Sequence, residues 1–201
     1  MNESPAHLPA ATPQRTVESD FHIFLRSLNE ACTRIIDRDY FQFSADGGDS
    51  SQERVYCYEL YHQLRIALPE DFPCKLHGEV SKGTHPVIRR IFGGRRTPDF
   101  IIHIPRSMEN NLVVMEVKPA QRSPSSLAAD HEKLTKFVEE ARYLRGILLT
   151  YSAGVQRVPR TVVQVSANST GKVWVLWQPG PGQEPQLIRR QGTTAEYGSS
   201  H

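Results

Sequence analysis

Two acidic residues and one lysine have the types and spacing of a chemical site. Asp99 opens one apolar segment, and Glu116 and Lys118 close the next. A hairpin in which Ile104 faces Asn111 puts Asp99 opposite Glu116, with Cβ atoms about 5 Å apart. Since strand side chains alternate between faces, Lys118 lies on the face of Glu116, about 7 Å further along. We therefore expect two acids and an amine to converge at one end of a sheet.

Carboxylates placed together beside apolar strands need a shared cation or a shared proton, because burial and mutual repulsion both disfavour their charged forms. A divalent metal meets this need. Hard oxygen ligands suit Mg²⁺, which takes one or two protein carboxylates and leaves positions for water and a phosphate. Lys118 would then stabilise charge on a phosphate, or orient or deprotonate the attacking water.

The pair Pro98-Asp99 followed by Glu116-Val117-Lys118 resembles the PD-(D/E)xK signature of the restriction-endonuclease-like nucleases. With its flanking elements the resemblance covers about residues 50–165. It implies an α/β fold with an αβββαβ core and a mixed central sheet flanked by helices. It also implies a metal-dependent phosphodiesterase, an endonuclease rather than an exonuclease, in which Asp99, Glu116 and Val117 hold Mg²⁺ or Mn²⁺ and Lys118 is catalytic.

The same resemblance implies a further acidic residue on the helix before the hairpin. Glu59 matches that position, and Glu79, near the end of the first expected strand, is its rival. Glu53 is a less suitable candidate because it completes a capping box with Ser50, in which its side chain is used by the helix terminus.

A basic segment precedes Asp99 and is expected to hold a nucleic-acid backbone, with DNA favoured over RNA. The alternative is a basic loop that only meets solvent. The residues assigned to this contact are Lys82, Arg89, Arg90, Arg95 and Arg96.

Apolar periodicity predicts the elements that must position these residues. Apolar residues that recur every three or four positions predict three helices. They lie at about 17–36, from about 53 to Pro69, and from about 126 to Gly146, which is expected to end the third helix. The basic side of that last helix, with Lys133, Lys136, Arg142 and Arg145, faces nucleic acid or water. Short apolar runs predict strands at 75–81, 100–104, 112–118, 147–151, 161–165 and 172–177.

Length and composition indicate a single domain. The chain has 201 residues, of which 38% are hydrophobic and 23% charged, which is ordinary for a globular protein. We expect one nuclease-like domain over residues 16–188, between a mobile N-terminal tail at 1–15 and a loose C-terminal tail at 189–201. The odd number of widely spaced cysteines favours buried free thiols over disulfides or zinc.

No apolar run approaches the ~20 residues of a membrane span, and the first fifteen residues lack the order of a secretory signal. We therefore expect a cytoplasmic protein without a membrane partner. Because the chain is small, we expect a protein partner or a homodimer to supply its specificity. The expected setting is host defence or DNA repair. A different class of function is also open, a non-catalytic nucleic-acid-binding or assembly module of the same fold.

Overall fold

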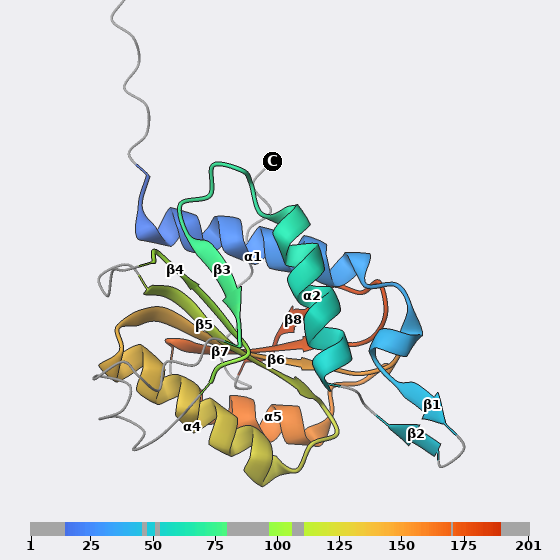
Figure 1. Ribbon diagram of the computed structural model, residues 1–201. Helices are drawn as coiled ribbons and strands as arrows, with labels where there is room; N and C mark the ends of the chain where they lie inside the picture. The colour runs from blue at the N-terminus through green and yellow to red at the C-terminus, as the bar shows by residue number, and fades with distance from the viewer. Residues whose placement is uncertain are drawn as a thin grey trace, which may run out of the picture.

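The computed structural model describes residues 15–45, 48–50, 53–79, 97–105, 111–169 and 171–189. It has an α/β fold built on a mixed, open, six-stranded sheet with helices on both faces (Figure 1). The two predicted tails lie outside the described residues, except for Arg15 and Arg189.

The sheet has the strand order β3-β4-β5-β6-β7-β8. β5 and β6 lie at its centre and are parallel, as are β6 and β7, whereas every other neighbouring pair is antiparallel. A separate two-stranded sheet is formed by β1 (Phe43–Ala45) and β2 (Gly48–Ser50). The strands of the large sheet are β3 (Lys75–Gly78), β4 (Phe100–His103), β5 (Asn111–Pro119), β6 (Tyr143–Tyr151), β7 (Val173–Gln178) and β8 (Gln186–Leu187).

The β4-β5 hairpin has the register expected from the sequence. Phe100 pairs with Met115 and Ile102 with Val113, so one further step outward brings Asp99 level with Glu116. The register shifts between Ile102 and His103, so that His103 rather than Ile104 faces Asn111. The irregularity lies at the turn end of the hairpin and leaves the end with the acidic residues in the predicted alignment.

The helices form two layers, one on each face of the sheet (Figure 1). α1 (Val17–Arg34) and α2 (Glu53–Ala67) cover one face, with the 3₁₀ turn η1 (Arg38–Tyr40) between them. α4 (Pro124–Glu140) and α5 (Arg160–Ser166) cover the other face. Among the described residues, no helix is long and apolar enough to cross a membrane.

Each face of β4 and β5 packs into its own apolar core. Phe100 and Met115 belong to the core under α1 and α2. Ile101 and Val114 alternate with them and belong to the core under α4 and α5. The hairpin is therefore covered on both faces, and polar groups on these strands are buried unless they lie at a strand end.

A buried hydrogen-bond network joins the first helices to the last long strand. Tyr56 of α2 donates its hydroxyl hydrogen to Oε1 of Gln178, at the end of β7. Gln178 Nε2 donates in turn to the Cys32 carbonyl at 2.9 Å. Gln178 is fully buried, so this network satisfies its amide in the core and ties segments that are distant in the chain.

The end of α4 differs from the prediction. The helix ends at Glu140, Arg142 has a φ of 56°, and β6 begins at Tyr143, so Gly146 lies inside a strand. A Cβ atom at Gly146 would lie 3.2 Å from Leu134 Cβ, which is tighter than ordinary contact. The glycine therefore permits close packing of α4 on β6, and its assignment as a helix terminator was wrong.

The segment predicted as a strand at 161–165 is instead helix α5. Val162 and Val165 are buried, three residues apart, while Val163 is 42% exposed, which is helical rather than alternating periodicity. The valines favoured a strand by local propensity, but β6 and β7 are parallel, and parallel neighbours need a crossover rather than a hairpin. The following strand, predicted at 172–177, is confirmed as β7.

Candidate active site

The three residues of the sequence motif meet at the carboxyl end of β5, around the ammonium of Lys118. Lys118 Nζ lies 3.4 Å from Asp99 Oδ2 and 3.7 Å from Glu116 Oε2. Its closest acidic partner is Glu53 Oε1, at 2.5 Å. We call Glu53, Asp99, Glu116, Lys118 and Lys133 the charged cluster.

The backbone of the hairpin holds Asp99 against β5. Asp99 directly precedes β4, and its Oδ2 accepts a hydrogen bond of 2.7 Å from the Val117 N–H. Its own carbonyl accepts a hydrogen bond of 2.9 Å from the Glu79 N–H, beyond the end of β3. Asp99 is therefore fixed through both its backbone and its side chain. Glu116 and Lys118 are two residues apart on β5, so both side chains project from the same face of the strand toward Asp99.

Glu116 is the most deeply buried member of the cluster, at 1% exposed. Lys133 of α4 places Nζ 2.6 Å from Oε1, yet Oε1 accepts no aligned hydrogen bond from the described residues. Burial and the negative charge of Asp99 raise the pKa of Glu116 to about 8, and Lys133 and Lys118 oppose this shift without reversing it. This raised pKa favours the neutral form of Glu116, whereas a further cation would favour its charged form.

Burial and ion pairing have opposite effects on the pKa values of Lys118 and Asp99, and ion pairing outweighs burial only at Lys118. Burial lowers the pKa of Lys118, but the carboxylates of Asp99, Glu53 and Glu116 outweigh burial, and the net pKa is raised. Burial raises the pKa of Asp99, although Lys118 and the Val117 N–H favour its charged form. Lys118 is therefore an ammonium ion at neutral pH, which suits charge stabilisation better than proton abstraction.

The helical acid that joins the cluster is Glu53, the first residue of α2. It precedes Cys57 and Leu60 by four and seven residues, so it extends the apolar stripe of α2 toward the strand ends. Glu59 lies off this stripe and accepts a hydrogen bond of 2.7 Å from Gln63. Glu79 places Oε1 3.7 Å from Arg54 Nε. From the sequence, Glu53 ranked below Glu59 and Glu79 as the further acidic residue, because its side chain was expected to cap the helix.

Lys133 was missed by the sequence argument, which placed it on a solvent-facing or nucleic-acid-facing side of α4. Its side chain is 16% exposed and contacts Glu116 and Asp130. Lys136, by contrast, is 44% exposed and pairs with Glu132. The place of Lys133 in the sequence could have indicated its burial, because Lys133 directly precedes buried Leu134 and so borders the apolar stripe of α4.

The donor atoms of the cluster suit a hard divalent metal in kind. Asp99 and Glu116 supply carboxylate oxygens, and buried Val117 can offer only its backbone carbonyl, since its side chain has no ligand atom. As the side chains stand, the described residues include no group of three His, Cys, Asp or Glu positioned to hold a metal ion. The Lys118 ammonium lies 3.4 Å from Asp99 Oδ2 and 3.7 Å from Glu116 Oε2, so a metal ion held by these residues would be a close neighbour of Lys118.

The basic residues expected to hold nucleic acid, Lys82, Arg89, Arg90, Arg95 and Arg96, lie outside the described residues.

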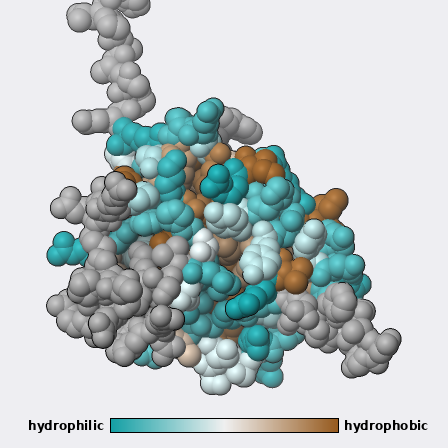
Figure 2. Space-filling view, in the orientation of Figure 1, coloured by the Kyte–Doolittle hydropathy of each residue, from teal (hydrophilic) through white to brown (hydrophobic). Residues whose placement is uncertain are grey.

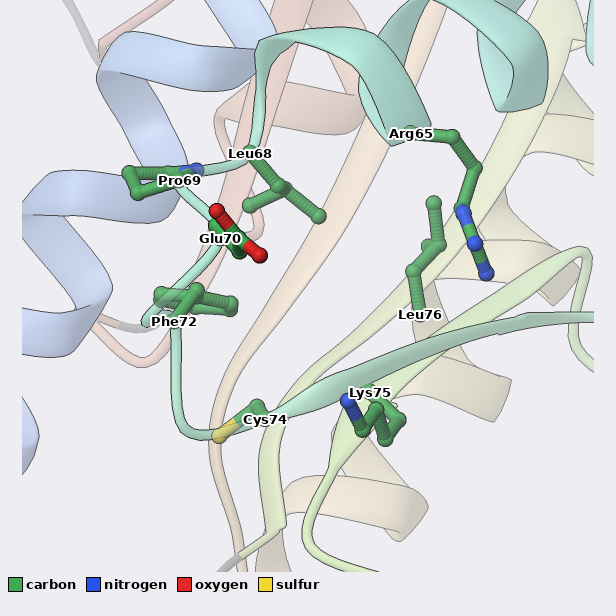
Figure 3. Close-up of a pocket in the computed structure, with 8 residues that line it drawn as sticks. All are labelled: Arg65, Leu68, Pro69, Glu70, Phe72, Cys74, Lys75 and Leu76. Atoms are coloured by element: carbon green, nitrogen blue, oxygen red, sulfur yellow. The ribbon is translucent and has the colours of Figure 1, made fainter.

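A small pocket of about 180 Å³ lies at the opposite end of α2 from Glu53. Its side chains come from the end of α2, the connection after it and the start of β3, and include Arg65, Phe72 and Lys75 (Figure 3). No residue of the charged cluster lines this pocket.

Comparisons of the chain with models of protein families, with curated proteins and with solved structures find no match.

Proposed function

We propose that the protein is a metal-dependent nuclease that hydrolyses phosphodiester bonds, with DNA favoured over RNA. The observation that carries the proposal is Glu116, buried to 1% exposure beside Asp99 and Lys118 at the end of β5. An acid buried next to another acid is costly to folding, and such arrangements are concentrated at functional sites.

Four residues of the charged cluster have a role in this proposal. Asp99, Glu116 and the Val117 carbonyl would hold Mg²⁺ or Mn²⁺, and the bound ion would polarise a phosphate and acidify a water molecule. Lys118 stabilises the negative charge that develops on the phosphate. Glu53 is a positioning residue, because its carboxylate holds the Lys118 ammonium at 2.5 Å.

The order of elements around the cluster supports a restriction-endonuclease-like core. Among the described elements, α2, β3, β4, β5, α4 and β6 come in the order αβββαβ. The acids lie on β5 and just before β4, and the lysine lies two residues beyond Glu116, as the PD-(D/E)xK resemblance implies.

The test is cleavage of plasmid DNA, linear DNA, single-stranded DNA and RNA by the purified chain with Mg²⁺, with Mn²⁺ or with a chelator. We expect cleavage that needs the metal, and loss of most cleavage in Glu116→Gln. Glu132→Gln is the matched control, because Glu132 lies on the exposed side of α4, 68% exposed. The proposal fails if no substrate is cut, or if both variants cut as fast as the wild type.

One observation favours the second candidate, a non-catalytic nucleic-acid-binding or assembly module. The Lys118 and Lys133 ammonium groups lie beside the three acidic side chains of the charged cluster, which therefore have charge partners within the protein itself. Nucleic-acid binding that is unaffected by Mg²⁺, together with no cleavage under any metal condition, would identify this module and exclude the nuclease.

A further inference from the structure

A pocket of about 310 Å³ opens directly beside the charged cluster. It lies between α2 and the ends of β3 and β4, and Asp99 is one of its lining residues. The pocket and the proposed phosphate site therefore share a side chain, so a molecule bound at one reaches the other.

The walls of this pocket are aromatic. Tyr61 stacks on Phe100, with ring centroids 6.2 Å apart and planes inclined by 17°. Tyr61 also donates a long hydrogen bond of 3.5 Å to the Leu76 carbonyl, which fixes its ring against β3. These contacts give the pocket a preformed apolar wall.

Tyr58 is the most exposed aromatic residue of the lining. It is 62% exposed, and it makes no ring contact with another described aromatic side chain. Apolar patches are also exposed among the hydrophilic residues on the face of the molecule that carries α2 (Figure 2). A planar ligand would gain a stacking partner in Tyr58 without displacing a described aromatic ring.

We propose that this pocket receives one unstacked nucleobase of the nucleic acid whose phosphate lies at Asp99 and Lys118. The inference rests on the proposed nuclease function and specifies its substrate class. A base hangs from the sugar beside its phosphate, and aromatic side chains bind bases by stacking on their faces. The carboxylate of Glu79, 54% exposed at the rim, can accept a hydrogen bond from an exocyclic amino group.

The chemistry of the lining argues for a base rather than another occupant. Asp99 and Glu79 would repel an anionic group inside the pocket, whereas a neutral aromatic ring with amino donors meets complementary partners. A base held in a duplex is stacked and paired, so it cannot enter. The substrate is therefore single-stranded, or a duplex opened at the nucleotide beside the cut.

The experiment measures binding of fluorescent single-stranded DNA in the presence of a chelator, which prevents cleavage. One oligonucleotide carries all its bases, and a second has the same phosphates with abasic sugars. We expect the wild type to bind the first about five- to hundredfold more tightly, the usual effect of one stacked base. Tyr58→Ala should lose that preference, and Tyr58→Phe should keep it.

Ile66→Ala is the matched control, because Ile66 is 54% exposed on the same helix but does not line the pocket. It should bind both oligonucleotides like the wild type. Equal binding of the two oligonucleotides by the wild type, or an unchanged base preference in Tyr58→Ala, would overturn the pocket assignment while leaving the nuclease intact. If the wild type binds neither oligonucleotide and cleaves no nucleic acid, the proposed function itself fails.

Discussion

Lys118 holds the acids of the cluster together because its ammonium lies within 4 Å of three acidic side chains. Its side chain is 13% exposed, so solvent screens these pairs only weakly. Removing one partner of a buried ion pair leaves the other charges uncompensated, which is more costly than the pair itself is favourable.

Lys118→Met should therefore lower the free energy of unfolding by about 3 kcal/mol. If Lys118 stabilises charge in the transition state, the variant should also bind metal and nucleic acid yet lose most cleavage at saturating substrate. Urea unfolding and a cleavage assay measure the two effects. Lys136→Met, at an exposed pair with Glu132, is the control and should leave stability unchanged within error. Turnover by Lys118→Met at the wild-type rate would count against the catalytic assignment.

The raised pKa of Glu116 predicts how the free energy of unfolding depends on pH. Burial raises its pKa from 4.5 to about 8, so the folded protein holds a proton that the unfolded chain releases between these values. The resulting stabilisation is full below about pH 4.5 and is lost as the pH rises through about 8, at about 1.4 kcal/mol for each unit of pKa difference.

Glu116→Gln cannot release this proton, so it should gain stability relative to the wild type as the pH rises from about 5 to about 8. Urea unfolding at several pH values in the presence of a chelator measures the difference. Asp99, whose pKa is also raised by burial, leaves a residual slope of the same sign in the variant. Parallel pH profiles for the two proteins would refute the raised pKa of Glu116.

At the level of single residues, local pattern located the motif but not all of its neighbours. Asp99, Glu116 and Lys118 were found because one hairpin brings them together, and its register follows from its own sequence. Glu53 and Lys133 come from other elements, and their contacts depend on how α2 and α4 dock on the sheet. Spacing along one helix shows which face a residue occupies, but not which strand end that face meets.

At the level of elements, the packing of α4 on β6 depends on Gly146. A Cβ there would lie 3.2 Å from Leu134 Cβ and 3.3 Å from Val138 Cγ2, so Gly146→Ala should separate helix and strand. We expect a loss of about 1–3 kcal/mol in the free energy of unfolding, as for other overpacked cores. Urea unfolding measures it.

Gly171→Ala is the control for this variant, because a Cβ at Gly171 would meet nothing within 4 Å. It should unfold at the same urea concentration as the wild type. The outcome that would contradict the packing argument is equal stability of both variants, since it would mean that α4 relaxes away from β6 without cost.

The elements with long, regular periodicity were predictable from the sequence, and the others needed tertiary context. α1 and α2 have apolar stripes over several turns, and β4 and β5 contain the apolar runs at 100–102 and 112–115. α5 has only seven residues and is rich in valine, so local propensity favoured a strand. Its helical form follows from the parallel pairing of β6 and β7, which a local window does not contain.

At the level of the whole molecule, the basic segment before Asp99 predicts how affinity responds to salt. A variant with Arg89, Arg90, Arg95 and Arg96 all replaced by alanine should bind DNA more weakly. Its slope of log affinity against log salt should fall by about one for each lost phosphate contact. Titrations of labelled DNA at several salt concentrations measure this slope. Identical slopes in the variant and the wild type would refute the contact.

The hydrogen bond between Tyr56 and Gln178 has a consequence for synthesis on the ribosome. The last residue of the charged cluster, Lys133, is made well before Gln178, which fixes α2 to the end of β7. At about 5–20 residues per second, the nascent chain spends seconds with all the cluster residues made but this link unmade. During that interval α2 has its contacts with α1 and β5 but lacks the hydrogen bond to Gln178, so we expect Glu53 to be held less firmly against Lys118 until the final strands emerge.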